Sequence, residues 1–159
     1  MPSQIQWFEV LRRKALSEAS LPQFVTEVLK DFSAVPGPFV VSLEGTPGAG
    51  KTTLVRMALR VIGLDPREPV NSPTFSYFNV YELGGQSYYH CDFYRGPGVI
   101  DMDEAGFEIN AVTAGVFVEW AELNPSLNSH CQTTHRILID SAQGIDKRDY
   151  VLLRRAGLV

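Results

Sequence analysis

The chain has 159 residues, of which 45% are hydrophobic and 20% charged, a balance typical of one globular domain with a sizeable core. Its formal net charge of −4 and its lack of a lysine- or arginine-rich block argue against a protein that grips nucleic acid by itself. The two cysteines, Cys91 and Cys131, form no CxxC pair and predict reduced thiols. With no secretory leader and no apolar run of about 20 residues, we expect a cytoplasmic protein without a membrane segment.

The first part of the chain predicts a helix followed by a buried strand. Residues 20–32, SLPQFVTEVLKDF, place apolar side chains at helical spacing, with Ser20 as the N-cap and Pro22 in the first turn. We therefore expect an N-terminal helical segment over about residues 1–34. After the breaker VPGP, residues 39–45, FVVSLEG, are short, apolar and β-branched, as a central strand is.

The rest of the chain alternates between helical and strand-like patterns. Residues 51–63, KTTLVRMALRVIG, predict a helix that ends near Gly63. Two strand-like runs, FSYFNVYEL and QSYYHCDFY, flank a Gly84-Gly85 pair that suits a tight hairpin turn. Further along we expect a short helix over residues 101–109 and strands in AGVFVEW, HRILID and DYVLLRR.

One motif between the first strand and the second helix carries chemistry. Residues 45–52, GTPGAGKT, fit the phosphate-binding pattern GxxxxGK[ST] in its required strand-to-helix setting. The glycines let backbone N–H groups approach a phosphate, and the helix N-terminus favours an anion there. Lys51 is expected to reach the β- and γ-phosphates, and the Thr52 hydroxyl to bind Mg²⁺.

Two acidic residues are candidates for the magnesium site. Asp92 follows the strand-like SYYHC and Glu119 follows AGVFV, where a P-loop protein needs a carboxylate at a strand end. His90 is expected to pack or hydrogen-bond behind the site, because Mg²⁺ prefers oxygen ligands. Trp120 is expected in the core. The loop NSPTF, residues 71–75, fits either a segment that responds to the γ-phosphate or an ordinary turn.

These elements define the expected fold. It is a P-loop NTPase-like α/β fold with a mostly parallel sheet, an antiparallel hairpin or edge, and flanking helices. We expect a single domain over residues 1–159, with a nucleotide-binding core at about 39–123 and C-terminal strands at about 135–155.

Several segments together resemble one family. GTPGAGKTTL, NSPTFSYFNVYEL, YYHCDFYR, DEAGFE and VFVEWAE occur in the order and spacing of the bacterial TsaE (YjeE) family, over about residues 39–122. Its members are small ATPases required for the threonylcarbamoyl modification of adenosine in tRNA. The resemblance implies an ATP- and Mg²⁺-dependent ATPase, slow alone, that resets a complex of TsaD-like and TsaB-like subunits between cycles and has at most indirect contact with tRNA.

The resemblance also implies roles for individual residues. Lys51, Asp92 and Glu119 would be catalytic, and Thr52, Glu119 and Asp92 would hold the metal. The family usually has Asp-Leu where this chain has Thr46-Pro47, a change at the rim of the loop. The nucleotide would be bound by Gly45, Gly48, Ala49, Gly50, Lys51, Thr52, Thr53, Thr74 in the responsive loop, and Arg148.

Two other functions remain open from the residues. A small-molecule or nucleoside kinase would share the P-loop but should carry an arginine-rich lid. Arginines cluster only in LRRK and RRAGLV, and neither segment looks like a lid. A non-catalytic module switched by ATP would also keep the P-loop, and the presence of both Asp92 and Glu119 argues weakly against it.

Overall fold

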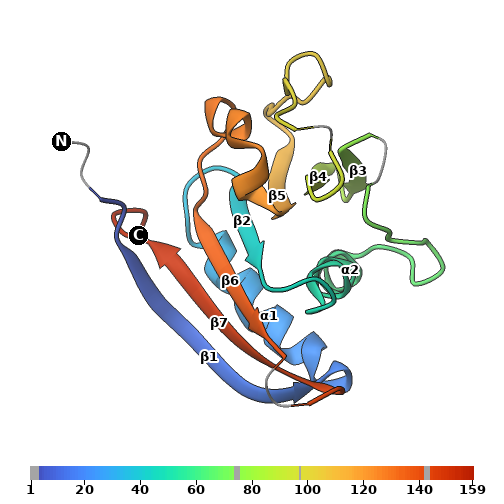
Figure 1. Cartoon of the computed structure of the whole chain (residues 1–159), viewed down its shortest axis with the longest axis vertical. Coiled ribbons are helices and arrows are strands. Elements are labelled where there is room, and N and C mark those ends of the chain that lie inside the picture. The colour runs from blue at the N-terminus through green and yellow to red at the C-terminus, as the bar shows by residue number, and fades with distance from the viewer. Residues whose placement is uncertain (1–3, 74–75, 97, 142–143) are drawn as a thin grey trace.

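The structure, a computed structural model, describes residues 4–73, 76–96, 98–141 and 144–159. Within these ranges, one seven-stranded sheet has the order β1-β7-β6-β2-β5-β4-β3 (Figure 1). Strands β6, β2, β5 and β4 run parallel in the centre, and antiparallel strands extend both edges. The expected α/β fold is confirmed. The strands are β1 (Trp7–Ser17), β2 (Phe39–Glu44), β3 (Phe78–Leu83), β4 (Gln86–Asp92), β5 (Thr113–Glu119), β6 (His135–Asp140) and β7 (Lys147–Arg155).

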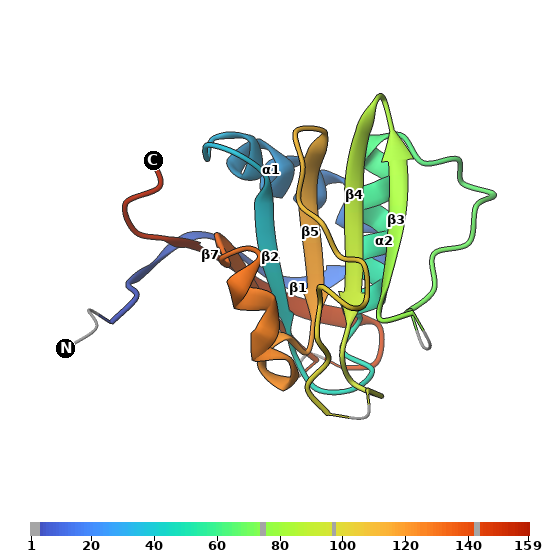
Figure 2. The same ribbon diagram turned by 90° about the horizontal axis from the view of Figure 1, so that it is seen from above.

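Helices α1 (Leu21–Ser33) and α2 (Lys51–Ile62) lie on the same face of the sheet (Figure 2). Their apolar side chains recur at helical spacing and pack on alternate residues of β2, such as Val41 and Leu43. The other face is covered by turns and by the short 3-10 helices η2 (Ala121–Leu123) and η3 (Pro125–Ser129). Across the described part of the chain, no helix is both long and apolar enough to traverse a bilayer.

Local turn chemistry follows the sequence closely at two places. Gly84 and Gly85 have φ angles of 59° and 78°, the left-handed conformation that joins β3 to β4. Helix α2 ends at Ile62, and the N–H of its C-cap residue Gly63 donates to the Leu59 carbonyl at 3.0 Å. Both the hairpin and the helix end were expected from the glycines, and both are confirmed.

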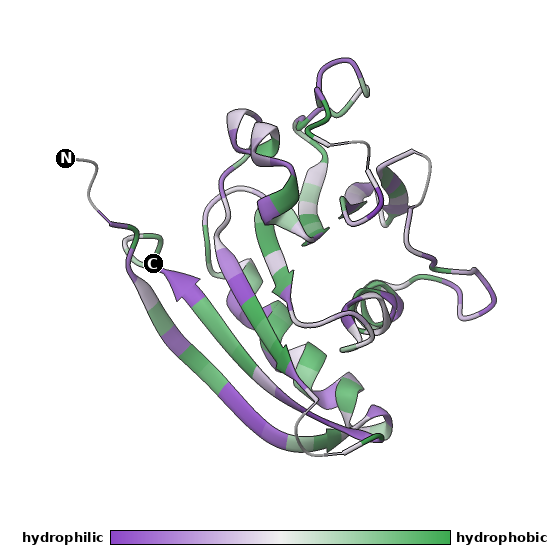
Figure 3. Ribbon diagram, in the orientation of Figure 1, coloured by the Kyte–Doolittle hydropathy of each residue, from purple (hydrophilic) through white to green (hydrophobic). Residues whose placement is uncertain are grey.

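The N-terminal segment differs from the expectation. Only its second half is α-helical: β1 occupies Trp7–Ser17, and the 3-10 turn η1 (Glu18–Ser20) leads into α1. The segment LRRKALS contains helix-forming residues but pairs with the outer edge of β7, with Leu11 opposite Leu152 and Leu16 opposite Arg148. Short apolar and charged blocks, such as VL and RRK, follow one another along this edge strand (Figure 3). Long-range pairing overrides local propensity here.

The expected short helix at residues 101–109 is also wrong, because this segment forms successive turns. The Asp101 carboxylate accepts hydrogen bonds from the N–H groups of Asp103 and Glu104, at 2.9 and 3.3 Å. Gly106 then takes a positive φ of 79°. An aspartate that binds the backbone in this way competes with helical hydrogen bonding.

Candidate functional site

The phosphate-loop motif connects β2 to α2 at the carboxyl end of the parallel strands. Gly50 is the N-cap of α2 with a φ of 105°, and no side chain caps this helix end. The first-turn N–H groups of α2 are therefore not satisfied by a capping side chain, as an anion site requires. Gly45 is closely packed: a Cβ there would lie 2.8 Å from the Ile139 carbonyl oxygen and 2.9 Å from the Ala49 Cβ.

Lys51 lies at the start of α2 and is 95% buried, with 5% of its surface exposed. Its Nζ donates hydrogen bonds to the main-chain carbonyls of Gly45 and Thr46, at 2.7 and 3.1 Å. Burial lowers the pKa of this ammonium, and the nearby carboxylates of Glu119, Asp92 and Glu122 act in the opposite direction. A phosphate would supply the counter-charge that the buried ammonium lacks.

Trp120 forms a wall beside Lys51. The Lys51 Nζ lies 4.3 Å from the centre of its ring, in a cation–π contact, and the Tyr94 ring stacks on it at 4.7 Å. We expected Trp120 in the core, but it is only partly buried. It follows β5 with a φ of 57°, a left-handed conformation that is uncommon for a bulky residue. This turn directs the indole towards the phosphate loop.

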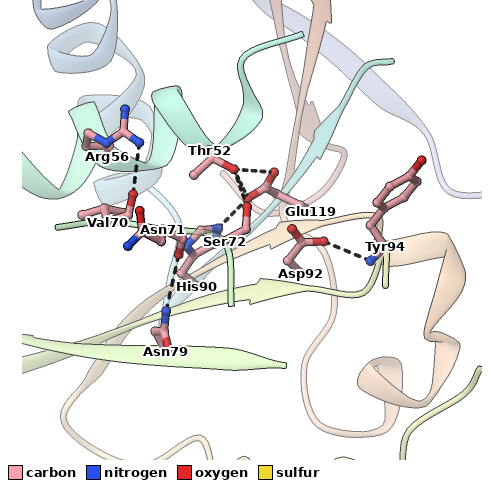
Figure 4. A network of polar contacts seen from close by, with 10 residues as sticks. All are labelled: Thr52, Arg56, Val70, Asn71, Ser72, Asn79, His90, Asp92, Tyr94 and Glu119. Atoms are coloured by element: carbon pink, nitrogen blue, oxygen red, sulfur yellow. Dashed lines mark hydrogen bonds and ion pairs between the residues drawn. The ribbon is translucent and has the colours of Figure 1, made fainter. Parts of the chain in front are cut away.

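The two candidate acids end neighbouring parallel strands. Asp92 on β4 and Glu119 on β5 are register partners, and β5 lies directly beside β2. The Thr52 hydroxyl lies 3.0 and 2.9 Å from the two Glu119 carboxylate oxygens and 2.8 Å from the Ser72 hydroxyl (Figure 4). The fold thus brings together Lys51 and Thr52 of the loop with both acids, around a cavity of about 470 Å³.

Asp92 has a different environment from Glu119. Its carboxylate accepts a hydrogen bond from the Tyr94 N–H at 3.0 Å, and it is half-buried whereas Glu119 is 3% exposed. Burial raises the pKa of the Asp92 carboxyl; the Tyr94 N–H lowers it, and the Glu119 charge adds to the rise. A nearby cation would favour the ionised form.

These oxygen donors fit a magnesium ion that is shared with a nucleotide. Within the described ranges, no group of three or more His, Cys, Asp or Glu side chains is close enough to hold a metal by itself. Mg²⁺ commonly keeps several waters and takes one or two carboxylates together with phosphate oxygens, so it needs no such group. Thr52, Glu119 and Asp92 could hold it in this way.

His90 lies behind the two acids, where the sequence analysis expected it, and its partner there is Glu119. Its Nε2 lies 2.6 Å from Oε2 of Glu119, and the side chain is fully buried (Figure 4). The signal was the H-x-D spacing of residues 90–92. Alternate residues of a strand face the same side, which places His90 beside the strand end that carries Asp92 and Glu119.

Arg148 approaches the loop from β7. Its Nε donates to the Ala49 carbonyl at 3.0 Å, and its NH1 donates to the carbonyls of Gly144 and Ile145 in the preceding turn and of Lys147 at the start of β7. It lines a second cavity of about 400 Å³ with Ser17 and Glu18, next to Gly50 and Thr53 of the loop. This cavity adjoins the first and could hold the nucleoside part of a nucleotide. Thr74 lies outside the described residues.

A larger cavity, of about 650 Å³, lies on the sheet face opposite the helices. Trp7 and the ion pair of Arg136 with Glu44 line it, and it reaches Gly45 and Trp120. It contains neither Lys51 and Thr52 nor the two acids. The smaller cavity, and not this larger one, is therefore the place where the charged and hydroxyl groups of the phosphate-loop motif and the strand-end acids converge.

A mostly parallel sheet with a glycine-rich phosphate loop between β2 and α2, faced by acids on neighbouring strand ends, defines a protein of the P-loop NTPase-like class. The model of the family described as "Threonylcarbamoyl adenosine biosynthesis protein TsaE" matches residues 16–150. The chain belongs to this TsaE family.

Individual relatives agree with this assignment. A protein of Aquifex aeolicus, "tRNA threonylcarbamoyladenosine biosynthesis protein TsaE", is 33% identical over 72% of this chain and 77% of its own length. The proteins of the same name from Nostoc and Bacillus subtilis are 41% and 38% identical, over 54% and 57% of this chain and 54% of their own lengths. The crystal structure of Bacillus subtilis YdiB aligns with a TM-score of 0.64 and 25% identity, covering 95% of this chain and 87% of YdiB.

Proposed function

We propose that this protein binds and hydrolyses ATP with Mg²⁺, as a subunit of the machinery that makes N6-threonylcarbamoyladenosine in tRNA. The observation that carries the proposal is the meeting of Lys51 and Thr52 with Glu119 and Asp92 in one cavity. The names of the relatives support the pathway.

The proposed roles follow from the position of each side chain. The loop N–H groups and the ammonium of Lys51 bind the phosphates and orient them. Thr52, Glu119 and Asp92 would hold Mg²⁺, and a bound Mg²⁺ would neutralise charge on the phosphate oxygens. Glu119, which hydrogen-bonds the Thr52 hydroxyl, is the acid best placed to act at the hydrolysis step. Arg148 fixes the loop through Ala49 and borders the nucleoside.

We infer that turnover is slow in the isolated chain. Arg95 lines the phosphate cavity, but within the described part of the chain no hydrogen bond fixes its side chain there, whereas Arg56 and Arg148 bind main-chain carbonyls. P-loop NTPases often receive a transition-state arginine or a positioning group from a partner. TsaD-like and TsaB-like subunits are the partners we propose, with hydrolysis resetting their complex between modification cycles and tRNA contacted indirectly.

The test is ATP turnover by the purified chain, alone and with the TsaD–TsaB pair of the same organism. The expected result is a low rate that rises with the pair and disappears in Lys51→Ala. Fast turnover stimulated by a nucleoside or a small alcohol, and indifferent to the pair, would identify a kinase instead. Tight ATP binding without turnover in any combination would leave the nucleotide as a structural switch.

A further inference from the structure

We propose that His90 is a positioning residue: its Nε2–H holds the Glu119 carboxylate in the orientation that serves the magnesium site. The inference rests on the proposed function, because it assumes that Glu119 acts at that site. Its structural basis is the 2.6 Å contact between His90 Nε2 and Glu119 Oε2, between side chains that are 0% and 4% exposed.

The burial of His90 defines which of its nitrogens carries the proton. A carboxylate oxygen can only accept a hydrogen bond, so Nε2 must be the donor in this contact. Nδ1 is also buried and has no hydrogen-bond partner among the described residues. A bare acceptor nitrogen is easier to leave unpaired there than an N–H, so a proton on Nε2 and a bare Nδ1 satisfy the hydrogen-bond geometry best.

The strand register explains why a histidine two residues before Asp92 can reach Glu119. His90 pairs with Phe117 and Asp92 with Glu119, and residues two apart on each strand face the helices together. His90 Nε2 contacts one oxygen of the Glu119 carboxylate, Oε2, and the Thr52 hydroxyl contacts both oxygens. Glu119 is therefore held from two directions.

This fixed orientation has a chemical consequence. A glutamate side chain rotates about three bonds, so its carboxylate can take many orientations. The short, charge-assisted contact with His90 selects one of them. Partners behind a metal ligand orient it and typically contribute 10–100-fold to metal affinity or activity. By this rule, the loss of the Nε2 donor should weaken the magnesium site while leaving the binding of phosphates by the loop intact.

The other fully buried histidine provides a matched control. His135 on β6 is 0% exposed, and its nitrogens face Asp31 at 3.0 Å and the Thr134 hydroxyl at 2.8 Å. Its two hydrogen-bond partners are separate from Lys51, Thr52, Asp92 and Glu119. Substituting His135 therefore reports the cost of losing a buried histidine away from the site.

The experiment measures the affinity of the full chain for a fluorescent ADP, in EDTA and at rising Mg²⁺, together with the melting temperature. For His90→Leu we expect unchanged affinity in EDTA and a loss of about tenfold in the gain that Mg²⁺ produces. For His90→Gln, whose amide can donate near the Nε2 position, we expect most of the gain to be retained. His135→Leu and His135→Gln should lower the melting temperature and leave the gain from Mg²⁺ unchanged.

The proposal is overturned if His90→Leu keeps the full gain from Mg²⁺, or if it changes only the melting temperature as His135→Leu does. If His90→Leu does not fold, the comparison of His90→Gln with His90→Asn tests the proposal, because the shorter asparagine cannot reach Glu119. Equal gains in ADP affinity from Mg²⁺ in these two variants would reject the positioning role. A wild-type chain with no gain from Mg²⁺ would refute the metal site itself. A wild-type chain with that gain but no ATP turnover beside its partners would refute the proposed hydrolysis and leave the role of His90 standing.

Discussion

Arg148, on the last strand of the sheet, donates a hydrogen bond from Nε to the main-chain carbonyl of Ala49 in the phosphate loop, at 3.0 Å. Its NH1 is held at the same time by the carbonyls of Gly144, Ile145 and Lys147. The guanidinium thus links the turn before β7 to the loop that precedes α2.

Replacing Arg148 should therefore loosen the phosphate loop. We expect Arg148→Gln to weaken ADP affinity by about tenfold, because one charged hydrogen bond is worth about 1.5 kcal/mol and glutamine cannot span both sides. The measurement is a titration with fluorescent ADP. The exposed neighbour Lys147 gives the control, since Lys147→Gln removes a charge from the same strand without touching the loop. Equal affinities for the two variants would contradict the prediction.

The buried ammonium of Lys51 predicts a pH dependence of nucleotide binding. Burial lowers its pKa, so the nucleotide-free protein loses this proton below the ordinary pKa of a lysine, and its stability rises as the pH passes through the lowered pKa. Bound phosphates need the charged form. ADP affinity should consequently fall as the pH rises from about 7.5 to about 10.

Lys51→Arg tests whether Lys51 is the group responsible. Arginine stays charged over this whole range. The ADP affinity of Lys51→Arg, whatever its absolute value, should therefore not fall as the pH rises. A wild-type affinity that does not fall over the same range would refute the prediction.

The raised pKa of Asp92 predicts a stability cost in the absence of a cation. A raised pKa means that protonation stabilises the fold; this contribution is complete below the ordinary pKa of an aspartate and is lost as the pH rises through the raised value. At neutral pH, Asp92→Asn should therefore melt about 1–3 °C above the wild type, a small gain because water screens a half-buried carboxylate. The difference should shrink as the pH falls. An Asp92→Asn variant that melts below the wild type at neutral pH would show that another interaction dominates.

Gly45 predicts a packing requirement in the phosphate loop. An added Cβ would lie 2.8 Å from the Ile139 carbonyl oxygen, a backbone atom of the neighbouring β6 that cannot easily move. We expect Gly45→Ala to destabilise the fold by about 1–3 kcal/mol in chemical denaturation and to weaken ADP binding. At Gly96 the nearest atom is the flexible Ile100 Cδ1, at 3.3 Å. Gly96→Ala should be nearly neutral, and a loss as large as that of Gly45→Ala would point to a general glycine effect.

The sequence was most informative where local chemistry decides the structure. The strand, glycine loop and helix around Lys51 follow from adjacent residues. The turn at Gly84-Gly85 follows from two glycines, which can adopt the positive φ angles that it requires. The position of β1 could not be predicted in this way, because it depends on pairing with β7 at the far end of the chain. In residues 101–109, the side chain of Asp101 replaced the expected helical hydrogen bonds with turns.

The candidate site shows the same division. Lys51, Thr52, Asp92 and Glu119 were found from a motif and from acids at strand ends, and the fold brings them together. The contact of His90 with Glu119 depends on the register of β4 against β5, which no single strand reveals. The direction of the Trp120 side chain depends on the left-handed backbone conformation of that residue. A bulky residue gives no sequence signal for this conformation. Their roles in catalysis and binding remain predictions.

The pairing of β1 with β7 also constrains when the protein can first bind its ligand. Leu16 and Ser17 of β1 and Arg148 of β7 line the same cavity beside the phosphate loop, so the first and the last strand of this sheet in chain order both build it. While the ribosome is still synthesising the chain, β1 has no partner and this wall of the cavity is missing. A nascent chain should therefore gain its full nucleotide affinity only after β7 has emerged, which makes ligand binding a late checkpoint of its biosynthesis.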